Sequence, residues 1–191
     1  MELPRIYTID DIYALPDGKR AELIDGNIYY MAPPSRKHQD IAGELFGTIR
    51  EYIKSNHGSC KPYIAPFAVF LNADDKNYVE PDISVICDSD KLNDKGCVGA
   101  PDWIIEIVSP SSKRMDYFTK LFKYRTAGVK EYWIVDPASL SIFPNWISNA
   151  NKSVASFLTT DLLLFCPYFY LIWSSSLPEV QFRSTCPRLV H

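Results

Sequence analysis

The sequence predicts an α/β domain, with mixed α+β character, in which helices flank a mixed β-sheet, and three observations support this class. The segment Asp102–Asp136 has the order strand, helix, strand, which predicts a crossover between two parallel strands. A long amphipathic helix precedes it, with apolar residues at helical spacing between Ile41 and Ile53. Asp25-Gly26 lies between two short apolar runs and predicts a β-hairpin.

The first third of the chain carries clear helix and turn signals. Thr8, followed three residues later by Asp11, predicts the start of a short helix. The hairpin follows, and the long helix begins near Ser35 in "SRKHQD". Gly58 suits the C-cap of that helix.

The middle of the chain alternates apolar runs with turns. Strands are predicted in Tyr63–Leu71, Asp82–Cys87, Asp102–Val108 and Glu131–Asp136, and the last two are short apolar runs typical of buried strands. The crossover helix between those two is expected to begin at Ser111 or Ser112 and to end at Gly128. Its apolar face is expected to contain Phe118, Leu121 and Phe122.

Composition narrows the class of protein. A net charge of −3 over 191 residues argues against a protein that coats nucleic acid, although an enzyme could still contact DNA locally. The five cysteines form no CxxC pair, so reduced thiols are expected rather than a disulfide framework or a zinc site. The charged N-terminus lacks the apolar core of an export signal, which favours a cytoplasmic location.

The chain divides into residues 1–137, rich in charges, and an apolar tail over residues 138–191. The first part is expected to form the core, and the tail either completes the same domain or is partly degenerate. The tail includes Leu162–Trp173, whose 12 residues are too few to span a bilayer and are interrupted by Pro167. A pair of core strands is the plainer interpretation, and we do not expect a membrane partner.

Three acids occupy strand positions. Asp82 begins one predicted strand, Glu106 lies within an Ile/Val run, and Glu22 begins the hairpin. An ionised carboxylate among apolar side chains is costly unless it is paired or binds a cation. Converging acids would suit Mg²⁺, whereas the alternative is a Glu106 that faces solvent from an edge strand.

Lysine and histidine candidates lie on the helices. Lys120 lies on one helix face with Asp116 and Tyr124 and could deliver its ammonium near the carboxylates, or it could form an ordinary surface pair with Asp116. Basic residues that could contact a phosphate backbone fall in two clusters: Arg36, Lys37 and His38, then Lys113 and Arg114. The chain has no GxSxG, GxGxxG or phosphate-binding GxxxxGK motif.

The ordered motifs "AELIDGNIYYM", "PPSRKHQ", "EPDISVI", "APDWIIEIVSPSS" and "DYFTKLFKYRTAGVKEYWIVDP" resemble the Uma-type restriction endonuclease family of the PD-(D/E)XK nuclease superfamily. The resemblance extends from about Tyr7 to Pro137. It implies a restriction-endonuclease-like core that hydrolyses DNA phosphodiester bonds with Mg²⁺ or Mn²⁺. A homodimer is compatible with cutting both strands.

The resemblance also assigns residues. Glu22, Asp82, Glu106 and Lys120 would be catalytic, and Asp82, Glu106 and the main-chain carbonyl of Ile107 would bind the metal. The lysine that the motif places two residues after its second acid is absent, because Val108 occupies that position, and Lys120 is the expected replacement. The altered tail and negative net charge also suit an alternative: an inactive nuclease-fold module that binds DNA or a protein.

Overall fold

The computed structural model describes residues 5–139, 141–146, 170–172 and 181–183. A five-stranded sheet lies at its centre, in the order β10-β9-β8-β5-β3. The strands β8 and β9 are parallel and the other neighbours are antiparallel. The bounds are Lys61–Ile64 for β3, Ile83–Ile86 for β5, Trp103–Ile107 for β8, Glu131–Asp136 for β9 and Ser141–Trp146 for β10.

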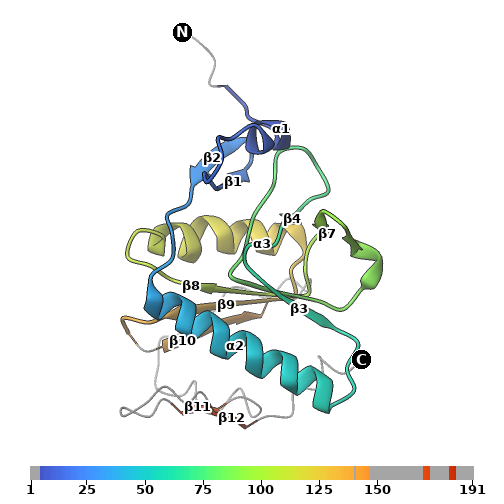
Figure 1. Ribbon diagram of the computed structural model, residues 1–191, viewed down its shortest axis with the longest axis vertical. Helices are drawn as coiled ribbons and strands as arrows, with labels where there is room; N and C mark the ends of the chain where they lie inside the picture. The colour runs from blue at the N-terminus through green and yellow to red at the C-terminus, as the bar shows by residue number, and fades with distance from the viewer. Residues whose placement is uncertain (1–4, 140, 147–169, 173–180, 184–191) are drawn as a thin grey trace.

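Helices cover both faces of this sheet. The helix α2 (Arg36–Ser55) lies on one face, and the crossover helix, made of the π-helical turn η2 (Met115–Lys120) and α3 (Leu121–Ala127), lies on the other (Figure 1). The crossover connects β8 to β9, as expected for a parallel pair. The predicted mixed α/β class is therefore confirmed.

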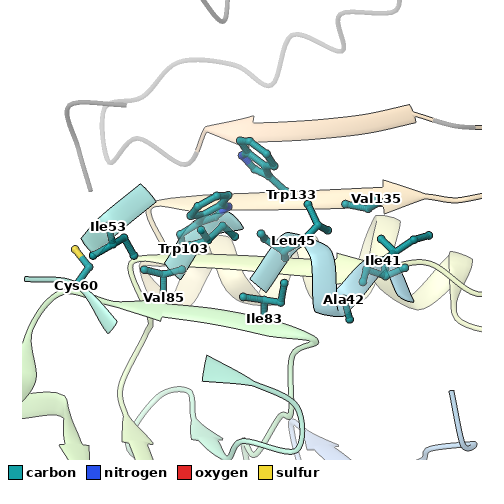
Figure 2. Close-up of a cluster of buried hydrophobic side chains, with 13 residues drawn as sticks. Ile41, Ala42, Leu45, Ile53, Cys60, Ile83, Val85, Trp103, Trp133 and Val135 are labelled. Carbon is teal, nitrogen blue, oxygen red and sulfur yellow. The ribbon is translucent and has the colours of Figure 1, made fainter. Parts of the chain in front are cut away.

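Alternation along β8 decides which side chains face which helix. Trp103, Ile105 and Ile107 pack with α2 in one hydrophobic cluster, part of which Figure 2 shows. Ile104 packs in the other cluster, together with side chains of α3. Because successive strand residues point to opposite faces, Glu106 faces the crossover helix.

The predicted N-terminal elements are confirmed. The helix α1 (Ile9–Tyr13) begins with a capping box between Thr8 and Asp11. The hairpin strands β1 (Ala21–Ile24) and β2 (Asn27–Tyr30) are joined through Asp25 and Gly26, whose φ angles are 50° and 75°. A left-handed turn of this kind favours Asp and Gly, which explains why the Asp-Gly signal is reliable.

A second, smaller sheet has the order β4-β7-β6, with β4 at Val69–Phe70, β6 at Leu92–Asn93 and β7 at Gly96–Val98. The short turn η1 (Ser89–Lys91) precedes β6. The single strand predicted over Tyr63–Leu71 is wrong, because it divides into β3 in the main sheet and β4 in the small one. Pro66 lies between them and lacks the N–H that would continue a ladder.

The crossover helix orients its side chains differently from the prediction. Phe118 and Phe122 are 72% and 69% exposed, whereas Asp116, Lys120 and Tyr124 are buried. The expected apolar face is thus wrong for both phenylalanines, since buried acids on the sheet and hairpin attract Lys120. Gly58 is also not the C-cap of α2, because Asn56 occupies that position.

The cysteines also depart from expectation. Cys60 and Cys87 form a disulfide, so the prediction of reduced thiols is wrong for this pair. The antiparallel register pairs Lys61 with Ile86, which brings Cys60, just before Lys61, opposite Cys87, just after Ile86. Cys97 is a buried free thiol.

The described part of the tail consists of β10, which joins the main sheet, and the pair β11 (Tyr170–Ile172) and β12 (Gln181–Arg183). Most of the apolar segment Leu162–Trp173 lies outside the described residues, as do Cys166 and Cys186. Among the helices that the structure describes, none has the length and hydropathy needed to cross a membrane.

Candidate active site

The pairing of β5 with β8 brings two of the predicted acids together. Ile83 pairs with Ile105 in the antiparallel register, so the preceding Asp82 stands opposite Glu106. The backbone N–H of Asp82 contacts Glu106 Oε2 at 3.4 Å. β8 is the middle strand of its sheet, and Glu106 is buried, so the alternative of a solvent-facing glutamate on an edge strand is excluded.

Two donors hold the other oxygen of Glu106. Lys120 Nζ lies 2.9 Å from Glu106 Oε1, and the hydroxyl of Tyr124 donates to the same oxygen at 2.7 Å. Burial raises the pKa of Glu106 well above its usual value. The charge of Lys120 opposes this rise, and the nearby carboxylates of Asp82, Asp116 and Glu22 add to it.

Lys120 is the centre of the acidic cluster. Its ammonium lies 2.8 Å from Glu22 Oε2 and 3.8 Å from Asp116 Oδ1, in addition to Glu106. Only 7% of its side chain is exposed, so the alternative of an ordinary surface pair is not observed. Burial disfavours its charge, but the surrounding carboxylates outweigh burial and raise the pKa of Lys120 well above its usual value.

Asp82 connects the cluster to solvent. Its Oδ2 accepts hydrogen bonds from the Ile107 N–H at 2.7 Å and from His38 Nε2 at 3.1 Å. The Asp82 and His38 side chains are 18% and 15% exposed, more than those of Glu106 and Lys120. The hydrogen bond to Asp82 raises the pKa of His38 against the effect of burial, and the charges of Asp82 and Asp116 raise it further.

The structure divides the basic candidates into two groups. His38, expected beside Arg36 and Lys37 on the surface, instead lies against Asp82 inside the cluster. The other four are exposed. Two of them approach the end of β9: Lys37 Nζ donates to the Pro137 carbonyl, and Lys113 Nζ donates to Asp136 Oδ2. Two chain segments thus bring cations to the carboxyl end of β9.

Sequence reasoning did not assign roles to Tyr124 and Asp116. Both are buried and contact the cluster, Tyr124 through Glu106 and Asp116 through Lys120. The signal was present, because Asp116, Lys120 and Tyr124 follow one another at four-residue spacing. Spacing alone did not indicate that this face of the helix is buried.

Within the described residues, no group of three or more His, Cys, Asp or Glu side chains is placed to hold a metal ion. A cation at this position would therefore be held by few protein ligands. Mg²⁺ is commonly bound through one or two carboxylates while it keeps several waters. The adjacent carboxylates of Asp82 and Glu106 fit such a site.

The fold of this chain is similar to a solved nuclease-like fold. A crystal structure described as "a putative nuclease belonging to DUF820", from Anabaena variabilis ATCC 29413, superposes with a TM-score of 0.61 and covers 74% of this chain and 80% of that chain. Its sequence is 24% identical, so this likeness concerns the fold. The predicted restriction-endonuclease-like architecture is confirmed at that level.

The family follows from the sequence model described as "Uma2: Putative restriction endonuclease", which matches residues 9–144. Because the match covers more than half of the chain, the protein belongs to this family, as the motifs predicted. A relative from Synechocystis sp., "Uncharacterized protein slr1290", is 26% identical over 125 residues. The match covers 65% of this chain and 64% of that protein, so the chain spans slightly less than two thirds of its relative's length.

Proposed function

We propose that this protein is a Mg²⁺-dependent endonuclease that hydrolyses DNA phosphodiester bonds at the cluster of Glu22, Asp82, Glu106 and Lys120. The observation that carries the proposal is the pairing of Asp82 with Glu106 at the end of two buried strands, with Lys120 against Glu106. Such an arrangement costs folding energy, because it gathers acids away from water. Membership of the Uma2 family supports nucleic acid as the substrate class.

The residues present suit a hard divalent cation. Three carboxylates surround Lys120, namely Glu22, Glu106 and Asp116, and Asp82 lies beside Glu106, so the cluster has more acids than lysines. We assign Asp82, Glu106 and the Ile107 carbonyl as ligands of Mg²⁺ or Mn²⁺. The Ile107 N–H donates to Asp82. Because the N–H and C=O of one strand residue point to the same side of the strand, the Ile107 carbonyl also faces Asp82, which supports it as a ligand.

When bound, the ion would polarise a phosphoryl oxygen and lower the pKa of an attacking water. The protein itself would contribute orientation and charge. Lys120 would hold Glu106 and donate to the attacking water, replacing the lysine that is absent at Val108. Glu22 would hold Lys120 in place, since its carboxylate is within 2.8 Å of the ammonium.

The substrate is expected to approach from the side of Asp82, because this is the more exposed edge of the cluster. We assign contacts with the phosphate backbone to four exposed cations: Arg36, Lys37, Lys113 and Arg114. Phosphate contacts of this kind position a nucleic acid without reading its sequence. His38 is assigned to the cluster rather than to this surface.

The test is cleavage of plasmid and single-stranded DNA by the purified chain with Mg²⁺ or Mn²⁺, beside Asp82→Ala and Glu106→Gln. We expect cutting by the wild type alone, abolished by chelation. Cutting that persists in Asp82→Ala would contradict the proposal. The experiment uses the full chain, because we infer that residues 138–191 complete the same domain as the 1–137 core. Analytical ultracentrifugation would test for a homodimer.

An inactive DNA- or protein-binding module of the same fold is the second candidate. The occupation of Lys120 by Glu22 and Glu106 favours it, because a lysine committed to two acids has fewer protons to offer a water. A salt-dependent, metal-independent gel shift without product would support this candidate. Metal-dependent product formation would exclude it.

A further inference from the structure

Each acid of the proposed metal pair has one oxygen that already accepts two hydrogen bonds. On Glu106 this is Oε1, which receives Lys120 Nζ at 2.9 Å and the Tyr124 hydroxyl at 2.7 Å. Among the described residues, only the Asp82 N–H contacts its Oε2, at the long distance of 3.4 Å. The carboxylate is therefore fixed with Oε2 toward Asp82.

Asp82 shows the same arrangement. Both hydrogen bonds that the described residues donate to its side chain reach Oδ2, one from the Ile107 N–H and one from His38 Nε2. His38 is itself held at the first turn of α2, because its backbone N–H donates to the side chain of the N-cap Ser35 at 3.2 Å. Oδ1 is left without such a donor.

Tyr124 is suited to a permanent donor role. Its side chain is completely buried, and its hydroxyl donates to Glu106 Oε1 at 2.7 Å. A tyrosine that only filled the core would have no need of a carboxylate partner. Buried hydroxyls usually find an acceptor, but a backbone carbonyl serves equally well.

Resting on the proposed function, we propose that Tyr124 and His38 are positioning residues that orient Glu106 Oε2 and Asp82 Oδ1 toward the divalent cation. Neither touches the reacting atoms. Partners that orient metal ligands are worth roughly 10–100-fold in metal affinity. The two residues act on different ligands, so each can be tested alone.

The chain supplies a matched control for Tyr124. Tyr132 is equally buried and lies against Tyr124, with ring centroids 5.0 Å apart, but its hydroxyl donates to the backbone carbonyl of Asp116 at 3.0 Å. Tyr124→Phe and Tyr132→Phe each remove one buried hydroxyl. Only the first loosens a carboxylate of the proposed metal pair.

The experiment measures Mn²⁺ affinity without DNA, by calorimetry and by the electron paramagnetic resonance signal of free Mn²⁺. Tyr124→Phe should weaken binding by roughly 10-fold or more, and Tyr132→Phe by less than about 2-fold. With DNA, Tyr124→Phe should lower kcat and leave KM unchanged. Equal Mn²⁺ affinity in Tyr124→Phe and wild type would overturn the role of Tyr124.

His38→Gln provides a second test, near the surface, where loss of fold is a smaller risk. We expect a weakening of roughly 10-fold, against no change in His57→Gln, which alters an exposed histidine beyond the end of α2. Wild-type affinity in His38→Gln would overturn its role. A wild-type protein that binds no Mn²⁺ would instead overturn the proposed function, whereas binding with unaffected variants overturns only this inference.

Discussion

Lys120 donates to Glu106 at 2.9 Å, and both side chains are almost completely buried. Lys120 belongs to the crossover helix and Glu106 to the middle strand of the sheet, so this contact ties the helix to the sheet through charge rather than through apolar packing. The same ammonium holds Glu22, a residue 98 positions away in the chain. One cation thus connects three elements of the fold.

Removing this cation should destabilise the protein. Lys120→Met keeps most of the side-chain volume but leaves the buried carboxylates without a counter-charge. We expect a loss of about 3–5 kcal/mol in the free energy of unfolding, the usual cost of breaking a buried pair. Urea unfolding followed by circular dichroism measures it.

The control for Lys120→Met is Lys54→Met, on the exposed C-terminal turn of α2, which should change stability by less than about 0.5 kcal/mol. Adding Glu106→Gln to Lys120→Met should recover part of the loss, because one uncompensated charge disappears. Strict additivity of the two losses would show that the residues are not energetically coupled.

Glu106→Gln alone should separate stability from metal binding. The substitution removes a charge that burial disfavours, while an amide oxygen still accepts from Lys120 and Tyr124. We expect the free energy of unfolding in the presence of chelator to change by less than about 1.5 kcal/mol, and Mn²⁺ binding to be lost. Calorimetric titration that finds wild-type Mn²⁺ affinity would remove Glu106 from the site.

Asp102 gives a pH-dependent prediction outside the site. Burial raises its pKa, but hydrogen bonds from Lys130 at 2.6 Å and the Cys87 N–H at 2.8 Å outweigh burial and lower it below 3.8. Since the folded pKa is below the unfolded one, the stabilisation is present above pH 3.8 and is lost as the pH falls through the folded pKa.

Asp102→Asn should accordingly flatten the decline of stability on the acid side of pH 3.8. Urea unfolding at a series of pH values compares it with wild type. Asp40→Asn, which alters an exposed helix acid paired with Arg36, is the control. An unchanged slope in Asp102→Asn would mean that other acids carry the effect.

Ser35→Ala should shorten or destabilise α2 at its first turn. The Ser35 side chain accepts the His38 N–H, and losing such an N-cap costs about 1 kcal/mol. Thermal unfolding measures the cost. Ser55→Ala, at the other end of α2, removes a hydroxyl that serves no N-cap and should cost clearly less.

The exposed cations near β9 should set the salt dependence of DNA binding. Lys37→Ala and Lys113→Ala remove cations that lie beside Pro137 and Asp136. If each neutralises one phosphate, the slope of log affinity against log salt should fall by about 0.9 per substitution. Filter binding at several salt concentrations measures the slope, and Lys54→Ala should leave it unchanged.

Several features were predictable from local sequence because local physics specifies them. The Asp25-Gly26 turn, the Thr8 capping box and the apolar stripe of α2 depend on backbone conformation and helical period. Phe118 and Phe122 are exposed, contrary to the prediction, because apolar character does not decide which face of this helix is buried. In this helix the buried face is polar, and its partners come from distant parts of the chain.

The sequence by itself determined the mixed α/β class, the parallel crossover and the family, because these depend on periodicity and on motifs that can be read in order. Tertiary structure decided what those residues meet. Four features depend on how distant segments of the chain pair and pack. They are the register that sets Asp82 opposite Glu106, the position of His38 against Asp82, the Tyr124 hydroxyl on Glu106 and the Cys60–Cys87 pair. A one-residue change of register would turn each strand side chain to the opposite face, and no local pattern specifies that choice.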